Sequence, residues 1–167
     1  MTTNYERALA GHTDVLEAWV QLNTAIKSHM DLRRYELATF AAAQRLKSSY
    51  CSLAHGKVLI DKFDEPVEQI ARDRAGAGLS DVDLAVMALA EKVVDDASAI
   101  GDEEKQPLRD LGLSEEEIVD VVLAAAARCF FSKTLDGIGA LPDASFRDEL
   151  PEQLRSVLVV GKPIADR

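Results

Sequence analysis

The stretch "SSYCSLAHGKVL", residues 48–59, places a serine, a cysteine and a histidine at helical spacing. On a helix, Ser48, Cys51 and His55 share one face, because residues three and four apart are neighbours there. If Ser48 or Ser49 is the N-cap, Cys51 lies in the first turn, where the helix dipole favours a thiolate. His55 lies one turn further on and can accept the thiol proton. The spacing suits an activated nucleophile, although a free cysteine more often packs in a core without reacting.

The preceding segment "YELATFAAAQRL", residues 35–46, carries a glutamate among side chains suited to burial. Glu36 has two interpretations. In the first it is a solvated carboxylate on the outer face, beside Arg33 and Arg34. In the second it turns inward and orients His55, as a third group usually orients a catalytic base.

Composition and periodicity predict an all-α fold in a single domain spanning residues 1–167. Apolar residues make up 47% of the chain, whereas aromatic residues make up only 5%, a balance that favours helices over a β-sandwich. We expect a frayed lead-in over 1–10 and, after residue 143, a tail with one short helix and an extended end that packs on a neighbouring subunit. Between them, apolar spacing and capping signals predict helices that begin at Thr13 (a candidate N-cap) or Asp14, after Asp31, at Ser48 or Ser49, at Val67, after Ser80 and after Ser114. A further short helix is expected to end at Gly112.

The charge balance excludes several classes of partner. The formal net charge is −10, so the surface repels phosphate backbones and we expect no nucleic-acid partner. No secretory signal and no run of about 18 apolar residues is present, so we expect no membrane association and a cytoplasmic location. Two cysteines do not make a disulfide framework. Only three histidines occur, so we expect neither a metal site nor a cofactor.

The spacing of Glu36, Cys51 and His55 resembles the motif E-x(11)-C-x-x-C-x-x-x-H of the alkylhydroperoxidase D and carboxymuconolactone decarboxylase family. The segments "LSDVDLAVMALAEKVVDD" (79–96) and "LRDLGLSEEEIVDVVLAAAARCFFSKTLDGIGA" (108–140) are also similar to that family. The resemblance covers a core of about 13–142 and leaves 143–167 as a tail. It implies an all-α fold, a small-molecule substrate and a homo-oligomer, either a trimer or hexamer or else a dimer. It also places Cys51 at the reactive-thiol position and Glu36 and His55 at the proton-relay positions.

This sequence departs from the family motif at Ser48, which replaces the first cysteine. A serine cannot form the disulfide of the dithiol mechanism, and Cys129, the other thiol, is expected to pack in the core. The resemblance therefore implies a one-cysteine peroxidase, in which Cys51 becomes a sulfenic acid that an external thiol reduces. Ser48 would then donate a hydrogen bond beside the thiolate. Two alternatives stay open: a decarboxylase-like acid–base enzyme acting on a small organic acid through His55 and Glu36, and a non-catalytic oligomeric member.

Overall fold

The computed structural model describes residues 2–166, and the regular structure of this part of the chain is entirely helical, without a strand, as predicted. Two short 3₁₀ turns, η1 (Arg74–Gly76) and η2 (Ala97–Ala99), interrupt the α-helices. No helix within residues 2–166 has the length and apolar character needed to cross a membrane. The α-helices are α1 (Asn4–Ala8), α2 (Thr13–His29), α3 (Leu32–Arg45), α4 (Ser49–Phe63), α5 (Val67–Arg72), α6 (Asp81–Asp96), α7 (Asp102–Asp110), α8 (Glu115–Gly137), α9 (Phe146–Glu149) and α10 (Glu152–Leu158).

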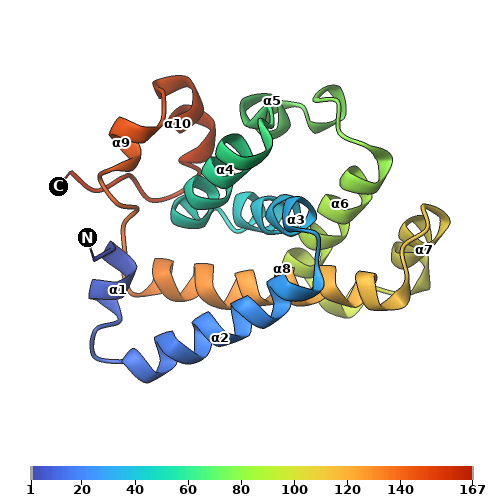
Figure 1. Cartoon of the computed structure of the whole chain (residues 1–167), viewed down its shortest axis with the longest axis horizontal. Helices are drawn as coiled ribbons and strands as arrows, with labels where there is room; N and C mark the ends of the chain where they lie inside the picture. Colours follow the sequence, from blue (N-terminus) through green and yellow to red (C-terminus); the bar gives the residue numbers. More distant parts are fainter. Residues whose placement is uncertain (1, 167) are drawn as a thin grey trace.

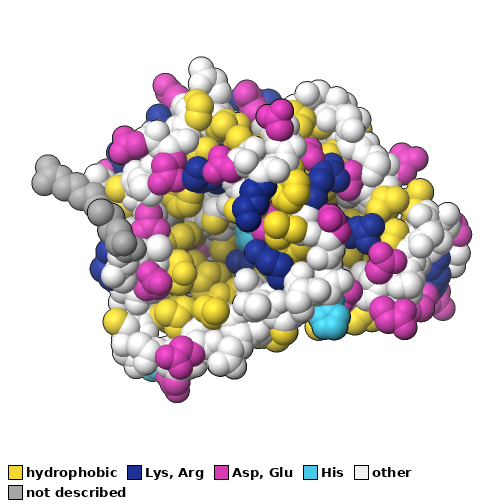
Figure 2. Space-filling model, viewed as in Figure 1, with side chains coloured by type: hydrophobic (Ala, Val, Ile, Leu, Met, Phe, Trp, Pro, Cys, Tyr) yellow, Lys and Arg dark blue, Asp and Glu magenta, His cyan; other side chains and the backbone are white. Residues whose placement is uncertain are grey.

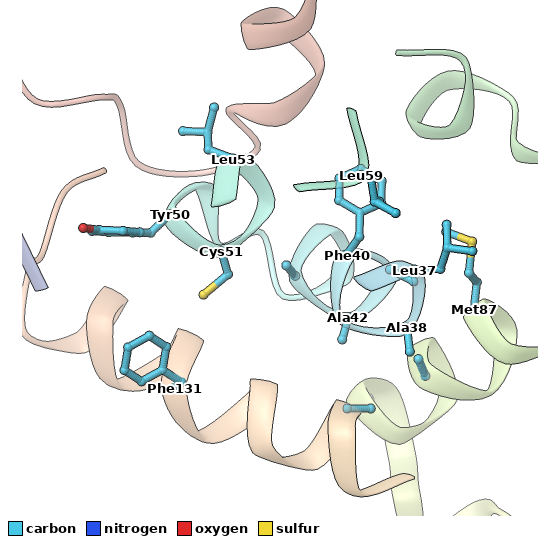
Figure 3. Packing of buried hydrophobic residues seen from close by; sticks show 14 of the residues in the cluster. Leu37, Ala38, Phe40, Ala42, Tyr50, Cys51, Leu53, Leu59, Met87 and Phe131 are labelled. Atoms are coloured by element: carbon cyan, nitrogen blue, oxygen red, sulfur yellow. The ribbon is translucent and has the colours of Figure 1, made fainter. Parts of the chain in front are cut away.

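Helix α3 is the centre of the fold, with α4, α6 and α8 packed around it (Figure 1). All nine residues from Tyr35 to Ala43 are buried, so this helix is covered on every side. Its alanines let neighbouring helices approach closely, and its larger side chains fill the gaps. Figure 3 shows Phe40 pointing toward Leu59 of α4, and Leu37 pointing toward Met87 of α6. Burying each such side chain stabilises the fold by about 1.5–3 kcal/mol.

Most of the expected helix starts occur where the sequence signals place them. Ser80 and Ser114 each accept a hydrogen bond from the third residue of the following helix, and that residue's carboxylate bonds back to the cap. Gly112 ends the turn after α7 with a φ of 91°, a conformation that glycine adopts without strain. The expected N-cap at Thr13 is wrong. Thr13 is the first residue of α2, and His12 holds the cap position without a side-chain bond.

The expected frayed lead-in is also wrong, because α1 forms within it. Thr3 caps this helix in a reciprocal box with Glu6. The backbone N–H of Asn4 donates to Oδ1 of Asp143 at 2.7 Å, which ties α1 to the loop after α8. The ring of Tyr5 lies edge-on against two aromatic rings of the core. These contacts order a short helix that its own sequence could not stabilise alone.

The tail contains two short helices, α9 and α10, rather than the single one expected, and it packs on its own chain. Leu158 of α10 is fully buried, and its side chain fills the space over Gly56, where any Cβ would come within 2.8 Å of it. The amide of Gly161 donates to the Ser49 hydroxyl at 2.8 Å. The chain itself thus covers the buried apolar side chains of the tail, Phe146, Leu150 and Leu158. Packing of the tail on a neighbouring subunit stays a prediction.

Candidate active site

The start of α4 places Cys51 as the sequence predicts. Ser48 occupies the N-cap position with extended backbone, and Cys51 lies in the first turn. His55 follows one turn later on the same face. Cys51 is 2% exposed and His55 is 8% exposed, so both side chains lie in the interior.

Glu36 turns inward and bonds to His55. Its Oε2 lies 2.6 Å from Nδ1 of the imidazole, and the glutamate is 1% exposed. The hydroxyl oxygen of Thr39 lies 3.1 Å from the same nitrogen. These oxygens keep the proton on Nδ1, which leaves Nε2 as the nitrogen that can accept another proton. The outward-facing, solvated interpretation of Glu36 does not agree with this geometry.

Burial and charge set the protonation of this pair. Burial and the positive charge of Arg128 outweigh the attraction of Glu36 and lower the pKa of His55 to about 4. Burial by itself would raise the pKa of Glu36, but the hydrogen bond with His55 and the charge of Lys27 hold it below its usual value. At neutral pH the imidazole is therefore neutral and the carboxylate is ionised, which is the combination that a base and its orienting group require.

Arg128 of α8 points into the site and reaches the sulfur. Its Nη1 lies 3.5 Å from Sγ of Cys51, and its Nη2 donates to the hydroxyl of Tyr35 at 3.3 Å. The side chain is 4% exposed, and no carboxylate in residues 2–166 lies within ion-pair distance of it. The stacked rings of Trp19 and Phe131 lie beside the guanidinium, with its centre 5.5 and 5.8 Å from the two ring centroids. These rings offset part of the free-energy cost of burying the cation. A thiolate at Cys51 would neutralise the charge of Arg128.

Arg128 was not predicted as a site residue, although the sequence contains a signal for it. It is the only charged residue between Asp120 and Lys133, in a long apolar run. Burying a lone arginine in such a run costs free energy of desolvation, which other interactions have to offset. Its partner on α4 lies 77 residues away in the chain, so local spacing could not identify it.

Two chains of polar contacts start on α2 and end at the site. Asn23 accepts a hydrogen bond from the Tyr35 hydroxyl at 2.6 Å, and Tyr35 in turn accepts one from the Arg128 guanidinium. Lys27, one turn after Asn23, donates to Oε1 of Glu36 at 3.2 Å, and Glu36 holds the imidazole. Consecutive residues of α3 thus position the cation and the base.

The predicted hydrogen bond from Ser48 to the sulfur does not occur. The Ser48 hydroxyl is buried and has no hydrogen-bond partner among the described residues, because the sulfur of Cys51 is turned to Arg128 on α8. Cys129 is only partly buried, and burial raises the pKa of its thiol. Within residues 2–166 no group of three or more His, Cys, Asp or Glu side chains is arranged to hold a metal ion.

Cys51 has almost no solvent-exposed surface. A groove of about 620 Å³ lies elsewhere, where Ile60, Val67 and Leu154 line a surface between α4, α5 and α10. Figure 2 shows Lys and Arg side chains gathered over the middle of one face, with a broad apolar area beside them. Because Cys51 is only 2% exposed, we expect a reactant to need local opening to reach the sulfur.

Comparison with known proteins identifies the fold. No protein-family model and no curated protein matches the sequence. The structure is similar to an uncharacterized peroxidase-related protein with an alkylhydroperoxidase AhpD core from Ralstonia eutropha JMP134 (TM-score 0.81, 21% identity, 91% of this chain and 84% of that chain). A peroxidase-related protein from Silicibacter sp. TM1040 gives a TM-score of 0.79 at 18% identity, covering 87% of this chain and 79% of that one. The debrominase Bmp8, solved as a cysteine-to-alanine variant in complex with 2,3,4-tribromopyrrole, gives 0.74 at 15% identity, covering 90% and 87%. The chain therefore has the alkylhydroperoxidase D-like fold.

The depressed pKa of His55 predicts an acid-sensitive fold. In the unfolded chain a histidine binds a proton near pH 6.5, whereas His55 in the folded protein stays neutral down to about pH 4. Between these values the unfolded state binds more protons, so the free energy of unfolding falls as the pH falls, by about 1.4 kcal/mol per pH unit for this one group. Urea denaturation at pH 7, 6 and 5 measures the slope.

The matched variant is His55→Gln, which cannot take up the proton. It should show a shallower fall in the free energy of unfolding than the wild type over the same range. His12 and His29 are exposed in both proteins and cancel in the comparison. Equal slopes for wild type and variant would contradict a neutral, buried His55.

Proposed function

We propose that the protein is a thiol-dependent, peroxidase-like oxidoreductase that reduces a hydroperoxide through Cys51 alone. The observation that carries the proposal is the contact between Nη1 of Arg128 and Sγ of Cys51 at 3.5 Å, in a buried site where no carboxylate of residues 2–166 pairs with the cation. A guanidinium in this position stabilises the thiolate, which is the nucleophilic form of cysteine. The peroxidase-related proteins with the same fold support this choice of chemistry.

The proposed reaction gives each site residue one role. His55 takes the thiol proton on Nε2, while the ionised Glu36 holds the ring in position. The Cys51 sulfur attacks the distal oxygen of the hydroperoxide, so that an S–O bond forms and the O–O bond breaks. The leaving oxygen takes the proton from His55 and departs as an alcohol, or as water from hydrogen peroxide. Sulfur loses two electrons in this step, and the peroxide gains them.

The second half of the cycle needs a reductant from outside the chain. Ser48 stands where a resolving cysteine would be needed, so no disulfide forms within the α4 motif. An external thiol attacks the sulfenic acid, an S–S bond forms and water leaves. A second thiol then releases Cys51 as the thiolate. A cytoplasmic location, where thiols are kept reduced, is part of the proposal.

An acid–base enzyme is the second candidate function. One protein with the same fold is a debrominase. A neutral His55 with an ionised Glu36, beside the buried Arg128 cation, would also suit proton transfer on a small organic anion. In that case Cys51 would line the site without being oxidised. A non-catalytic member would show neither reaction.

The test is mass spectrometry of Cys51 after treatment with hydrogen peroxide or an organic hydroperoxide. We expect Cys51 to gain one oxygen atom, which a dithiol reductant removes, and Cys51→Ser to gain none at this position. Arg128→Met keeps much of the side-chain volume but removes the charge, so the oxidation rate at pH 7 should fall at least about tenfold, equivalent to about 1.4 kcal/mol.

The control variant is Arg72→Met, which removes an exposed arginine from α5. It should leave the oxidation rate of Cys51 within about twofold of the wild type. A Cys51 that stays unmodified in excess peroxide would contradict the proposal and favour the acid–base or non-catalytic alternatives. A reactive Cys51 that is indifferent to Arg128→Met would remove Arg128 from the mechanism.

We also propose that the protein is a homo-oligomer, a trimer or hexamer. Its support is a set of exposed apolar side chains on α2 and α8, two helices that adjoin where the rings of the buried Trp19 and the exposed Phe130 lie 5.8 Å apart. Large exposed apolar patches mark interaction sites more often than free surface. The exposed apolar side chains of these helices are Val15, Val20, Leu22, Val119, Leu123 and Phe130.

Light scattering at micromolar concentration measures the assembly directly. A trimer or hexamer mass is expected, and the substitution Phe130→Glu should lower it, because a charge at this position opposes burial of the surface. A monomer mass for the wild-type protein would contradict the proposal.

A further inference from the structure

Four buried polar side-chain atoms within residues 2–166 have no hydrogen-bond partner. One is Nε of Arg74, and the other three lie on α8 or at the start of α4, the helices joined by the contact between Arg128 and Cys51: Oγ of Ser48, Oγ of Ser132 and Nε of Arg128. The two serines are completely buried, and Arg128 is nearly so. Buried polar groups are hydrogen-bonded in the great majority of cases, and each exception needs an explanation. Here three exceptions fall on two helices that meet at the candidate nucleophile.

Helix register places Ser132 on the same face of α8 as Arg128, and Ser48 on the same face of α4 as Cys51. Ser132 lies one turn after Arg128, and Ser48 lies one turn before Cys51 at the start of α4. The first turn of α4 and the last turn of α8 are neighbours, because Gly161 bonds to Ser49 and the next residue, Lys162, bonds to the backbone oxygen of Asp136.

The two helices therefore run in opposite directions past each other. It follows that Ser48 and Ser132 lie on the same side of the contact between Cys51 and Arg128. Figure 3 shows the side chain of Cys51 pointing toward α8, the helix that carries Phe131.

We propose that Ser132, Ser48 and the Nε–H of Arg128 form a binding site for the O–O group of a small hydroperoxide, with hydrogen peroxide as the best fit. This inference rests on the proposed function. Two hydroxyls and a guanidinium N–H supply donors for the oxygen that leaves when sulfur attacks its neighbour. Negative charge develops on that leaving oxygen in the transition state, and preorganised donors in a buried site stabilise it strongly.

The enclosure of the site sets the substrate class. Cys51 is 2% exposed, and the rings of Tyr50 and Phe131 each lie against Tyr5 of α1, which closes this end of the molecule. A bulky organic group on the peroxide would have to displace these rings, whereas a second hydroxyl would not. Ser48 has a positive role in this arrangement, since a hydroxyl donates to oxygen far better than a thiol does.

The experiment compares two reactions of the same sulfur in the Ser132→Ala variant. Oxidation of Cys51 by hydrogen peroxide should slow at least about tenfold, because a leaving-oxygen donor is lost. Alkylation of Cys51 by iodoacetamide should stay within about twofold of the wild type, because iodide rather than an oxygen leaves. The melting temperature should be unchanged or higher, since removing an unpartnered buried hydroxyl relieves its desolvation cost.

Ser52→Ala is the matched control. Ser52 is a completely buried serine beside Cys51, but its hydroxyl already accepts a hydrogen bond from Gln44 at 2.8 Å. Its removal should not affect the ratio of peroxide oxidation to alkylation. Ser48→Ala, in contrast, should lower this ratio in the same direction as Ser132→Ala.

The outcomes separate the two proposals. If hydrogen peroxide does not oxidise wild-type Cys51, both the proposed function and this site are wrong. If Cys51 is oxidised and Ser132→Ala leaves the ratio unchanged, only the donor site is wrong. If cumene hydroperoxide oxidises the wild type as fast as hydrogen peroxide does, the restriction to small substrates is wrong.

Discussion

The contact between a buried guanidinium and a buried thiol is the constraint on which the rest of this site depends. Arg128 carries a full positive charge into the interior, and within residues 2–166 no carboxylate meets it there. Aromatic faces offset only part of that cost. The sulfur of Cys51 lies 3.5 Å from Nη1 of the guanidinium, and the Tyr35 hydroxyl lies 3.3 Å from Nη2. A contact between residues 77 positions apart in the chain thus sets the surroundings of the sulfur, in addition to its place in the first turn of α4.

Helix α3 makes this arrangement rigid. Tyr35 and Glu36 are consecutive, so their side chains leave the helix about 100° apart and reach different neighbours. Tyr35 contacts the guanidinium on α8, and Glu36 contacts the imidazole on α4. Residues of α2 hold both side chains. Asn23 accepts a hydrogen bond from Tyr35, and Lys27 donates one to Glu36. Positioning of this kind, by groups whose own rotamers are fixed by packing, is what a precise site requires.

The sequence predicted the parts of this architecture that local spacing encodes. Cys51 and His55 share a face because helical periodicity requires it, and Ser80 and Ser114 begin helices because their capping partners lie three residues on. The inward turn of Glu36 followed from the resemblance to a known motif rather than from spacing. Arg128 was not predicted, because its role depends on a contact between α8 and α4 that no local pattern describes. Helix α1 was missed for a different reason: its capping pair, Thr3 and Glu6, is visible in the sequence, but five residues become helical only when tertiary contacts hold them.

We propose that His55, held by Glu36, makes Cys51 a working nucleophile. The most direct measurement is the rate of Cys51 oxidation by hydrogen peroxide in wild type and Glu36→Gln at pH 7, with unfolding curves recorded for both. The substitution keeps the shape of the side chain but removes the negative charge that orients and supports the imidazole. General base catalysis contributes ~10²–10⁴-fold, so we expect the rate to fall at least about tenfold in a folded protein. An unchanged rate with a reactive Cys51 would contradict it.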